Sequence, residues 1–383
     1  MENTREGFGD LLIAAGGTGG HIFPALAVLE VLRRRHPEMK VTWVGSSHRM
    51  ESTLIPSRGI EFVGLRQTEI RRGLNPMNIL YNTRTLFLLI GSVFRSVGLI
   101  RRIRPGIILT TGGFAAGAAG LAAWMTRTPL AIIEPNAYPG LTNRFLGKRA
   151  SAVFTAYPEA KTFFREKKTH AIGSPARIEV VERDRKSARA QLGLGDDTLM
   201  LLAMGGSQGA AGINRTLPES VKLISMTARG MDLRVVHQCG RGKLDQVVVD
   251  RKALPESRYS VVEFIDDIPT YLAAADAVVC RAGASTLSEV ACRGLPSVIV
   301  PYPFSAENHQ VRNARAWESA GAALCIEESE LNPSHLANKI VILLTDPRMR
   351  NVMGEKARKF GDPSAAEKIA DIIEELAARK RVS

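Results

Sequence analysis

Residues 11–21 read LLIAAGGTGGH, an apolar run that passes directly into a glycine-rich turn. The residues that follow, 24–35, repeat apolar side chains with the spacing of a helix. A strand, a tight turn and a helix in this order are typical of the first unit of a parallel sheet covered by helices on both faces. This stretch therefore predicts an α/β fold.

Short apolar segments that predict further strands continue the alternation. In the first half of the chain they lie at 41–44, 107–109, 131–133 and 152–154. The pattern starts again after Gly173, where the run 199–204 enters a second glycine-rich turn, GGSQGA at 205–210. Strand-like segments then follow at 233–237, 259–262, 277–280 and 297–300.

Two successive α/β series, each opened by a strand and a glycine-rich turn, predict two Rossmann-like, doubly wound domains that face one another. We place the N-terminal domain at 1–172 and the C-terminal domain at 173–360. The remaining residues, 361–383, contain an amphipathic helix for which Ser364 is a suitable N-cap. We expect this helix to pack back toward the N-terminal domain.

The bulk composition fits an ordinary folded protein of this size. A chain of 383 residues is long for one hydrophobic core and comfortable for two domains. The four cysteines lie far apart, with no Cys-x-x-Cys pair, which disfavours a zinc knuckle or a disulfide framework. The first ten residues are polar and mixed in charge, unlike a secretory signal. We therefore expect a cytosolic protein.

The positive charge is concentrated in the first domain. Residues 1–172 carry 23 basic and 11 acidic side chains, a net charge of +12, whereas the rest of the chain carries 28 and 27. The stretch 70–133 has no acidic residue but eight arginines: Arg71, Arg72, Arg84, Arg95, Arg101, Arg102, Arg104 and Arg127. Such a field attracts nucleic acid, anionic lipid or a phosphorylated substrate. Aromatic residues make up only 6% of the chain, so we expect no nucleic-acid partner.

The first glycine-rich turn, Gly16 to Gly20, can present backbone N–H groups to an anion or a sugar oxygen. Its spacing departs from the dinucleotide pattern G-x-G-x-x-G, and it lacks the lysine of a P-loop. No acidic residue ends the second strand, so a nicotinamide dehydrogenase is disfavoured. His21 stands at the mouth of the turn, where an imidazole can act as a general base. A turn that serves only for packing is the alternative.

Two stretches of the second half also suggest a binding site. The turn at 205–210 precedes a helix, so its N–H groups and the Ser207 hydroxyl can hold a diphosphate. Glu289 follows a strand and a turn of small residues, one helical turn after Ser285. It can accept hydrogen bonds from both hydroxyls of a ribose, or it can be the glutamate of a capping box. Spacing alone favours neither alternative.

One predicted helix of the first domain carries a dense set of apolar side chains: Ile79, Leu80, Leu86, Phe87, Leu89, Ile90, Val93 and Phe94. Its longest run without charge, 85–94, is about half of what spanning a bilayer requires. The pattern indicates either a helix that lies in the membrane interface with its arginines toward lipid phosphates, or a core helix of the first domain. The two alternatives can hold for different faces.

Four motifs occur in a fixed order: GGTGGHIFPA at 16–25, N-x-x-x-GLTNR at 136–144, GGSQGA at 205–210 and EFIDD at 263–267. With Glu289 and Gln310, they closely resemble glycosyltransferase family 28. The match is to its bacterial N-acetylglucosaminyltransferases of peptidoglycan synthesis, from Leu11 to the C-terminal helix. The resemblance implies a GT-B fold with the active site in an interdomain cleft.

The resemblance also implies the substrates: the donor UDP-N-acetylglucosamine (UDP-GlcNAc) and the acceptor undecaprenyl-pyrophosphoryl-muramyl-pentapeptide. The acceptor implies a peripheral position on an anionic membrane surface, at the cytoplasmic face of the inner membrane. The residues implied to contact the donor are Thr18, Gly19, Gly20, Asn136, Arg177, Ser207, Ile265, Ala284, Ser285, Thr286, Leu287, Ser288, Glu289 and Gln310. Ile265 serves through its backbone at the uracil, Glu289 at the ribose, and Asn136 and Gln310 at the GlcNAc hydroxyls.

We expect an inverting, single-displacement transfer in which His21 takes the proton of the muramyl 4-hydroxyl. The chain contains no Asp-x-Asp motif, so we expect no metal and no other cofactor. The pair Asp266-Asp267 is more simply a helix start. Another lipid acceptor, such as diacylglycerol, is the alternative within the same fold.

The chain departs from the usual family pattern at four places. These are IEPN at 133–136 for His-Glu-Gln-Asn, GSPAR at 173–177 for Gly-Asn-Pro-Val-Arg, GFAAGAAG at 113–120 for a version with Tyr, Val, Ser and Pro, and His309-Gln310 for Gln-Gln. We expect these departures to leave the donor chemistry intact and to affect the details of the acceptor loops.

Overall fold

The computed structural model describes residues 9–66, 75–206, 208–228 and 230–382. The chain forms two compact units. Unit 1 comprises the residues up to Pro175 together with those from Ser364 onward, and unit 2 comprises Ala176–Pro363. Each division lies three residues after the position that we expect from sequence.

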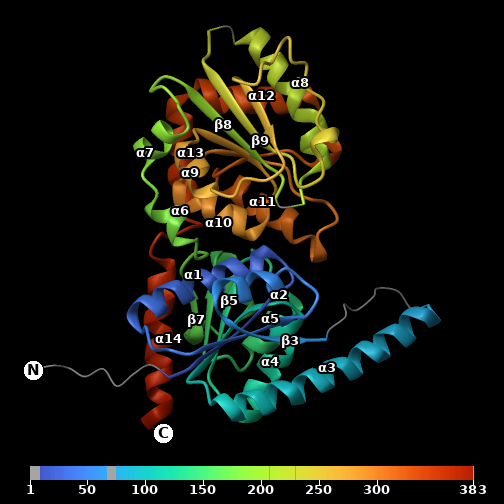
Figure 1. Ribbon diagram of the computed structural model, residues 1–383, viewed down its shortest axis with the longest axis vertical. Coiled ribbons are helices and arrows are strands. Elements are labelled where there is room, and N and C mark those ends of the chain that lie inside the picture. The colour runs from blue at the N-terminus through green and yellow to red at the C-terminus, as the bar shows by residue number, and fades with distance from the viewer. Residues whose placement is uncertain (1–8, 67–74, 207, 229, 383) are drawn as a thin grey trace, which may run out of the picture. The chain divides into compact units, whose positions relative to one another are not determined.

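Within the described residues, unit 1 contains a seven-stranded parallel sheet with the order β3-β2-β1-β4-β5-β6-β7 (Figure 1). Its strands are β1 (Leu11–Ala15), β2 (Val41–Ser46), β3 (Glu61–Leu65), β4 (Ile107–Gly112), β5 (Leu130–Glu134), β6 (Ala152–Thr155) and β7 (Thr169–Ala171). Its helices are α1 (Gly19–Arg35), α2 (Glu51–Leu54), α3 (Pro76–Ile103), α4 (Gly113–Thr126), α5 (Leu141–Gly147) and α14 (Ala365–Val382). Short 3-10 helices lie at η1 (Pro56–Arg58), η2 (Pro158–Phe163) and η3 (Glu166–Lys168).

Strand β1 is buried on both faces, as a parallel strand between two helical layers must be. Leu11 and Ile13 pack with α1 and α14 on one face, while Leu12 and Ala14 pack with α3 and α4 on the other. Helix α1 begins at Gly19, five residues before the predicted start, because the second half of the glycine turn already has helical geometry.

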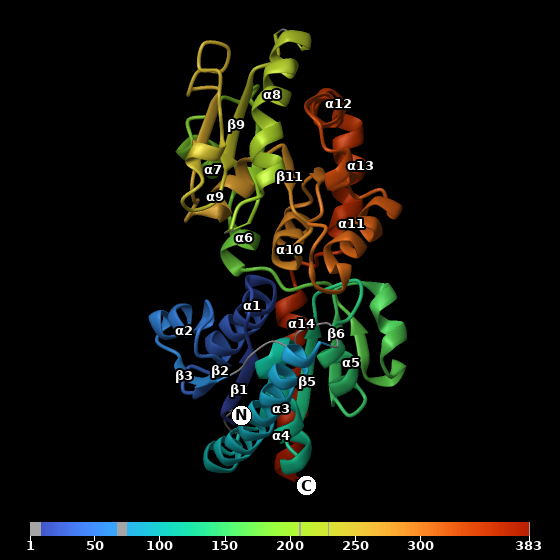
Figure 2. The ribbon, with the colours of Figure 1, turned by 90° about the vertical axis from the view of Figure 1, so that its right-hand side faces the viewer.

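Helix α14 belongs to the core of unit 1 although it ends the chain. Ile369 and Ile373 are fully buried in the same cluster as β1 and α1. At the edge of this contact, Arg35 pairs with Asp371 at 2.6 Å and His36 with Glu374 at 2.9 Å. Figures 1 and 2 both show α14 alongside the sheet of unit 1.

Unit 2 contains a parallel sheet of six described strands, in the order β10-β9-β8-β11-β12-β13. The strands are β8 (Leu199–Met204), β9 (Leu233–Gln238), β10 (Tyr259–Val262), β11 (Ala277–Cys280), β12 (Ser297–Ile299) and β13 (Leu324–Cys325). The helices are α6 (Ile178–Glu182), α7 (Arg185–Gln191), α8 (Ala211–Thr227), α9 (Ile268–Ala274), α10 (Ala284–Arg293), α11 (His309–Ser319), α12 (Pro333–Thr345) and α13 (Pro347–Arg358), with 3-10 helices η4 (Leu244–Gln246), η5 (Ala306–Asn308) and η6 (Glu328–Glu330). Helices α8 and α12 pack on one face of this sheet.

Both sheets confirm the prediction of two doubly wound α/β domains. In such sheets a ligand site forms where the strand order reverses, at the carboxyl ends of the strands. The reversal lies between β1 and β4 in unit 1 and between β8 and β11 in unit 2. The two glycine-rich turns therefore stand at the positions where the fold provides binding sites. None of the described helices is long and apolar enough to cross a membrane.

Candidate active site

The first glycine-rich turn joins β1 to α1 at the switch point of unit 1. Gly17 has a φ of +93°, a backbone conformation that side chains other than glycine rarely adopt. Thr18 is extended and acts as the N-cap residue of α1, so Gly19, Gly20 and His21 form its first turn. The N-terminal end of a long helix thus stands at the switch point of the sheet in unit 1.

His21 is half-buried, and its ring contacts the turn that precedes it. The Nδ1 atom lies 3.3 Å from the carbonyl oxygen of Gly16, and the Thr111 hydroxyl donates to the backbone oxygen of His21 at 2.6 Å. A carbonyl oxygen only accepts, so Nδ1 carries the proton in this contact, and in the neutral imidazole the lone pair then lies on Nε2. This is the tautomer that a general base acting through Nε2 requires.

Asn136 follows β5 and is held by Glu134, a carboxylate that belongs to none of the four ordered motifs. Glu134 is 1% exposed and accepts four hydrogen bonds. The donors are Asn136 N at 3.0 Å, Asn136 Nδ2 at 3.1 Å, Gly140 N at 3.2 Å and Asn143 Nδ2 at 2.8 Å. Burial raises the pKa of Glu134 to about 7. The four donors favour the ionised carboxylate and therefore oppose this rise in pKa. In the sequence, Glu134 could have been found as the single acidic residue at the end of an apolar strand.

Arg177 and Glu289 form a mostly buried ion pair in unit 2. The Arg177 Nε atom donates to Glu289 Oε1 at 2.6 Å, and the Glu289 side chain is 9% exposed. Burial raises the pKa of Glu289, and the neighbouring guanidinium opposes that rise. Arg177 therefore holds the carboxylate that we expect at the ribose.

The capping-box alternative for Glu289 is wrong. Helix α10 has Gly283 as its N-cap, so Glu289 is the sixth helical residue, and a capping box needs the third. The predicted donor residues from Ala284 to Glu289 form the first two turns of this helix, which a three-residue turn separates from the end of β11.

Ile265 and Gln310 lie on other elements of unit 2. The Ile265 N–H donates to Gln238 Oε1 at 3.0 Å, and Gln238 Nε2 donates to Gly206 O at 3.2 Å. Gln238 thus links the segment predicted at the uracil to the second glycine-rich turn. Gln310 stands at the start of α11, and its Oε1 accepts from Tyr302 N at 3.0 Å.

Two consecutive residues before α11, Glu307 and Asn308, have φ values of 52° and 55°. Such left-handed backbone costs about 1–3 kcal/mol for a residue other than glycine and clusters at functional sites. The strained corner leads directly into the helix that carries Gln310. Asp267, by contrast, caps α9 through the N–H of Thr270 at 3.3 Å, as expected for a helix start.

A buried network of hydrogen bonds lies next to the second glycine-rich turn. Asn214 Nδ2 donates to Cys239 O at 2.9 Å, and a Cβ on Gly209 would collide with that same oxygen. His237 lies 3.1 Å from Asn214 Oδ1 through Nε2 and 2.8 Å from the Tyr259 hydroxyl through Nδ1. Ser207 lies outside the described residues, as do Arg71 and Arg72.

We expect the stability of the protein to fall in acid through His237. Burial lowers the pKa of this histidine to about 4, from an ordinary value of 6.5. Between pH 6.5 and pH 4 the unfolded chain therefore binds more protons than the folded protein does. The stability that the neutral imidazole contributes is fully present above pH 6.5 and is lost as the pH falls toward 4. The loss amounts to about 3 kcal/mol.

Urea unfolding at pH 7, 5.5 and 4.5 measures this effect, with His237→Gln as the variant that cannot titrate. The variant should show a shallower decrease of the unfolding free energy over this range. An equal decrease in both proteins would contradict the assignment to His237.

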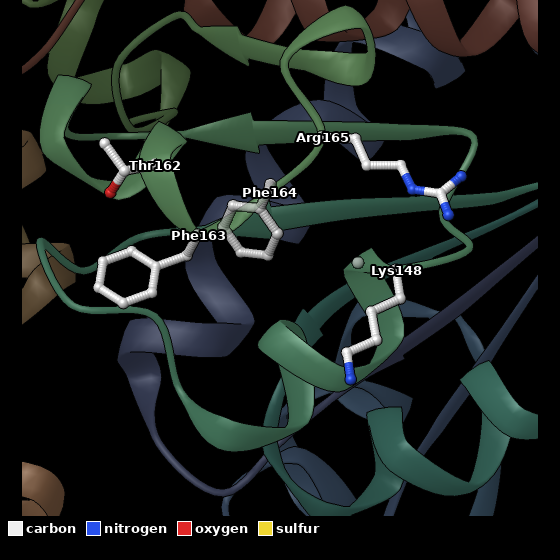
Figure 3. A pocket seen from close by; sticks show the side chains of 6 residues that line it. Lys148, Thr162, Phe163, Phe164 and Arg165 are labelled. Atoms are coloured by element: carbon white, nitrogen blue, oxygen red, sulfur yellow. The ribbon is translucent and has the colours of Figure 1, made fainter.

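A surface hollow of about 240 Å³ lies where α5 meets η2 (Figure 3). Lys148, Phe163, Phe164 and Arg165 line it together with Gly147 and Thr162. None of the residues predicted at the donor or as the base is among them. Among the described residues, no group of three or more His, Cys, Asp or Glu side chains could hold a metal ion.

Comparison with known proteins gives a family for both units. The model of the glycosyltransferase family 28 N-terminal domain matches residues 11–155, and that of the family 28 C-terminal domain matches residues 200–376. The crystal structure of MurG from Acinetobacter baumannii is similar with a TM-score of 0.74 and 28% identity, over 96% of this chain and 99% of that one. The UDP-GlcNAc 2-epimerase of Neisseria meningitidis, with a TM-score of 0.63 and 13% identity, shares the fold alone.

Two curated relatives are similar over nearly their whole length. The protein of Desulforudis audaxviator is 36% identical over 96% of this chain and 99% of its own. The protein of Myxococcus xanthus is 38% identical over 96% of this chain and 92% of its own. Both are named UDP-N-acetylglucosamine–N-acetylmuramyl-(pentapeptide) pyrophosphoryl-undecaprenol N-acetylglucosamine transferase. The chain therefore belongs to glycosyltransferase family 28 and is an enzyme that transfers a sugar.

Proposed function

We propose that the protein transfers N-acetylglucosamine from UDP-GlcNAc to the 4-hydroxyl of undecaprenyl-pyrophosphoryl-muramyl-pentapeptide, with inversion at the anomeric carbon. The names of relatives that are 36–38% identical support the substrates. The observation that carries the chemistry is the contact between His21 Nδ1 and Gly16 O, because it favours the neutral tautomer whose lone pair lies on Nε2.

In this reaction unit 1 supplies the base. His21 Nε2 takes the proton of the muramyl 4-hydroxyl while that oxygen forms a bond to the anomeric carbon of GlcNAc. The bond from this carbon to the β-phosphate oxygen breaks at the same time, and UDP leaves with the electron pair. General-base assistance of this kind contributes about 10²–10⁴ in rate. Asn136, which donates to Glu134, contacts the GlcNAc hydroxyls in this proposal.

Unit 2 supplies the donor site. Glu289, held by Arg177, accepts hydrogen bonds from the ribose hydroxyls. The second glycine-rich turn stands before α8, a helix of 17 residues, so the N–H groups and the positive end of the helix stabilise the charge that develops on UDP. Ile265 and Gln310 contact the uracil and the sugar.

The test of this function is transfer of label from UDP-GlcNAc to a defined acceptor. Purified protein is incubated with the labelled donor and either the lipid-linked muramyl-pentapeptide or diacylglycerol. We expect a labelled disaccharide on the muramyl lipid and none on diacylglycerol. Labelling of diacylglycerol alone would overturn the acceptor assignment and leave a sugar transferase of another lipid.

We further propose that the protein binds the cytoplasmic face of the inner membrane peripherally, through helix α3. One face of α3 packs in the core of unit 1 through residues that include Val97 and Ile100. The opposite face exposes Leu80, Phe87 and Phe94 at intervals of seven residues, with exposed fractions of 73%, 71% and 63%. Figure 1 shows the N-terminal part of α3 extending beyond the sheet. The core-helix alternative from the sequence thus holds for one face, and the membrane alternative is our proposal for the other.

Basic side chains accompany this apolar face. Arg95, Arg101 and Arg102 are exposed on α3, and lipid phosphates attract such residues with about 1 kcal/mol each. The side chains of Ile79 and Arg84 lie outside the description. An amphipathic helix of this kind lies in the interface with its apolar side toward the acyl chains.

Replacing both Phe87 and Phe94 by glutamate should lower binding to vesicles rich in anionic lipid by about 10²-fold, since each buried aromatic ring contributes roughly 1.5–3 kcal/mol. Co-sedimentation at low salt measures it. Met226→Glu, at a residue of α8 in unit 2 that is 61% exposed, is the matched control and should bind as the wild type does. Equal retention of the double variant and the control would exclude α3 as the contact.

A further inference from the structure

We propose that Glu51 is the positioning residue of the catalytic base. Its carboxylate fixes the peptide plane that sets the tautomer of His21. This inference rests on the proposed role of His21. Glu51 opens α2, lies 34 residues away from the turn in sequence, and is 0% exposed.

The carboxylate of Glu51 is bound to the ends of two neighbouring strands. Gly17 N donates to both of its oxygens at 3.1 Å, and Ser46 N, at the end of β2, donates to Oε1 at 2.9 Å. A buried carboxylate requires such donors, because an unpaired charge in the interior is strongly destabilising. The Gly17 N–H therefore serves Glu51, and the first turn carries its own anion where a nucleotide-binding turn would take a phosphate.

Two glycines, Gly16 and Gly45, leave space for the side chain of Glu51. A Cβ on Gly16 would collide with Oε1, and a Cβ on Gly45 would lie 2.6 Å from Cγ. Glycines at the ends of both strands thus leave room for one side chain. The shape of the turn and the position of this carboxylate are consequently coupled.

Glu51 and His21 contact opposite edges of the same peptide group. The Gly16 carbonyl oxygen lies 3.3 Å from His21 Nδ1. The N–H of the next residue, Gly17, donates to the Glu51 carboxylate. The bond between them is trans and planar, so its C=O and N–H point in opposite directions and turn together. With the N–H held by Glu51, the carbonyl must face His21.

Without the carboxylate, this peptide group can rotate, because the glycines on both sides allow a wide range of backbone angles. If the Gly16–Gly17 peptide group rotates, the Gly17 N–H faces His21 Nδ1 in place of the Gly16 carbonyl oxygen. The imidazole then accepts at Nδ1 and carries its proton on Nε2, where it can no longer take the proton of the acceptor hydroxyl. Glu51 thereby acts on catalysis through the tautomer of His21, without touching substrate.

The variant Glu51→Gln tests this, because its amide keeps the size of the side chain but offers only one acceptor oxygen. We expect kcat to fall by about 10–100-fold, a part of the contribution of a general base, with the KM for UDP-GlcNAc unchanged. The ¹⁵N chemical shifts of the His21 ring should lose the signature of the Nδ1–H tautomer. Glu61→Gln, an exposed carboxylate of the same unit, is the control and should change neither quantity.

The double variant with His21→Ala separates this inference from the proposed function. If Glu51 acts through His21, adding Glu51→Gln to His21→Ala causes little further loss, whereas independent effects multiply. Near-normal turnover of His21→Ala alone overturns the base assignment itself. Loss of activity in His21→Ala with normal kcat and normal tautomer in Glu51→Gln overturns only the role of Glu51.

Should Glu51→Gln fail to fold, Glu51→Asp takes its place. The shorter carboxylate keeps the charge but cannot reach both Gly17 and Ser46. Reduced kcat at unchanged donor KM supports the positioning role, and wild-type kcat overturns it.

Discussion

Replacing His21 by alanine should lower turnover by about 10²–10⁴-fold, the range that general-base assistance supplies. The alcohol of the acceptor is a poor nucleophile until its proton is removed, and Nε2 of His21 is the atom that we assign to this step. Binding of UDP should stay nearly unchanged, because the proposed contacts to the uracil and the ribose lie in unit 2. Steady-state transfer assays and calorimetric titration with UDP measure the two quantities.

His48→Ala is the matched control for this experiment. His48 is an exposed histidine of the same unit and should turn over at the wild-type rate. Near-normal turnover of His21→Ala would remove the base assignment, whatever the control shows.

Replacing Glu289 by alanine should weaken UDP-GlcNAc binding by at least about 10²-fold. Two hydrogen bonds that the ribose hydroxyls donate to a carboxylate contribute about 1.5–3 kcal/mol each. The substitution also leaves Arg177, whose side chain is 19% exposed, without the carboxylate that it pairs with at 2.6 Å. Titration with UDP-GlcNAc and with UDP measures the loss, which should be equal for both because both carry the ribose.

Glu318→Ala, at an exposed glutamate of α11, controls for the loss of a negative charge in unit 2. Arg177→Ala provides a second check. Without the guanidinium the pKa of Glu289 rises further, so the affinity for UDP should fall as the pH is lowered. An unchanged dissociation constant in Glu289→Ala would contradict its role at the ribose.

Most strands could be predicted because each is a short apolar run, and β1 and β8 also lead into a glycine-rich turn. The strands absent from the prediction are β3, β7 and β13, which all form sheet edges. Their side chains are only partly buried, so their apolar pattern is weak. The boundary of α1 was misplaced because glycines at its start have a low helix propensity, which the tertiary structure overrides.

Sequence alone determined the two α/β series and the two glycine-rich turns, and it singled out His21 as the candidate base, since each of these is a pattern of residues that lie close together in the chain. Only the tertiary structure decided what holds these parts in place. Glu51 reaches Gly17 across 34 residues, and Arg177 reaches Glu289 across 112. Such contacts depend on which strands become neighbours, and the order of strands in a sheet is a property of the packed core that no local pattern records.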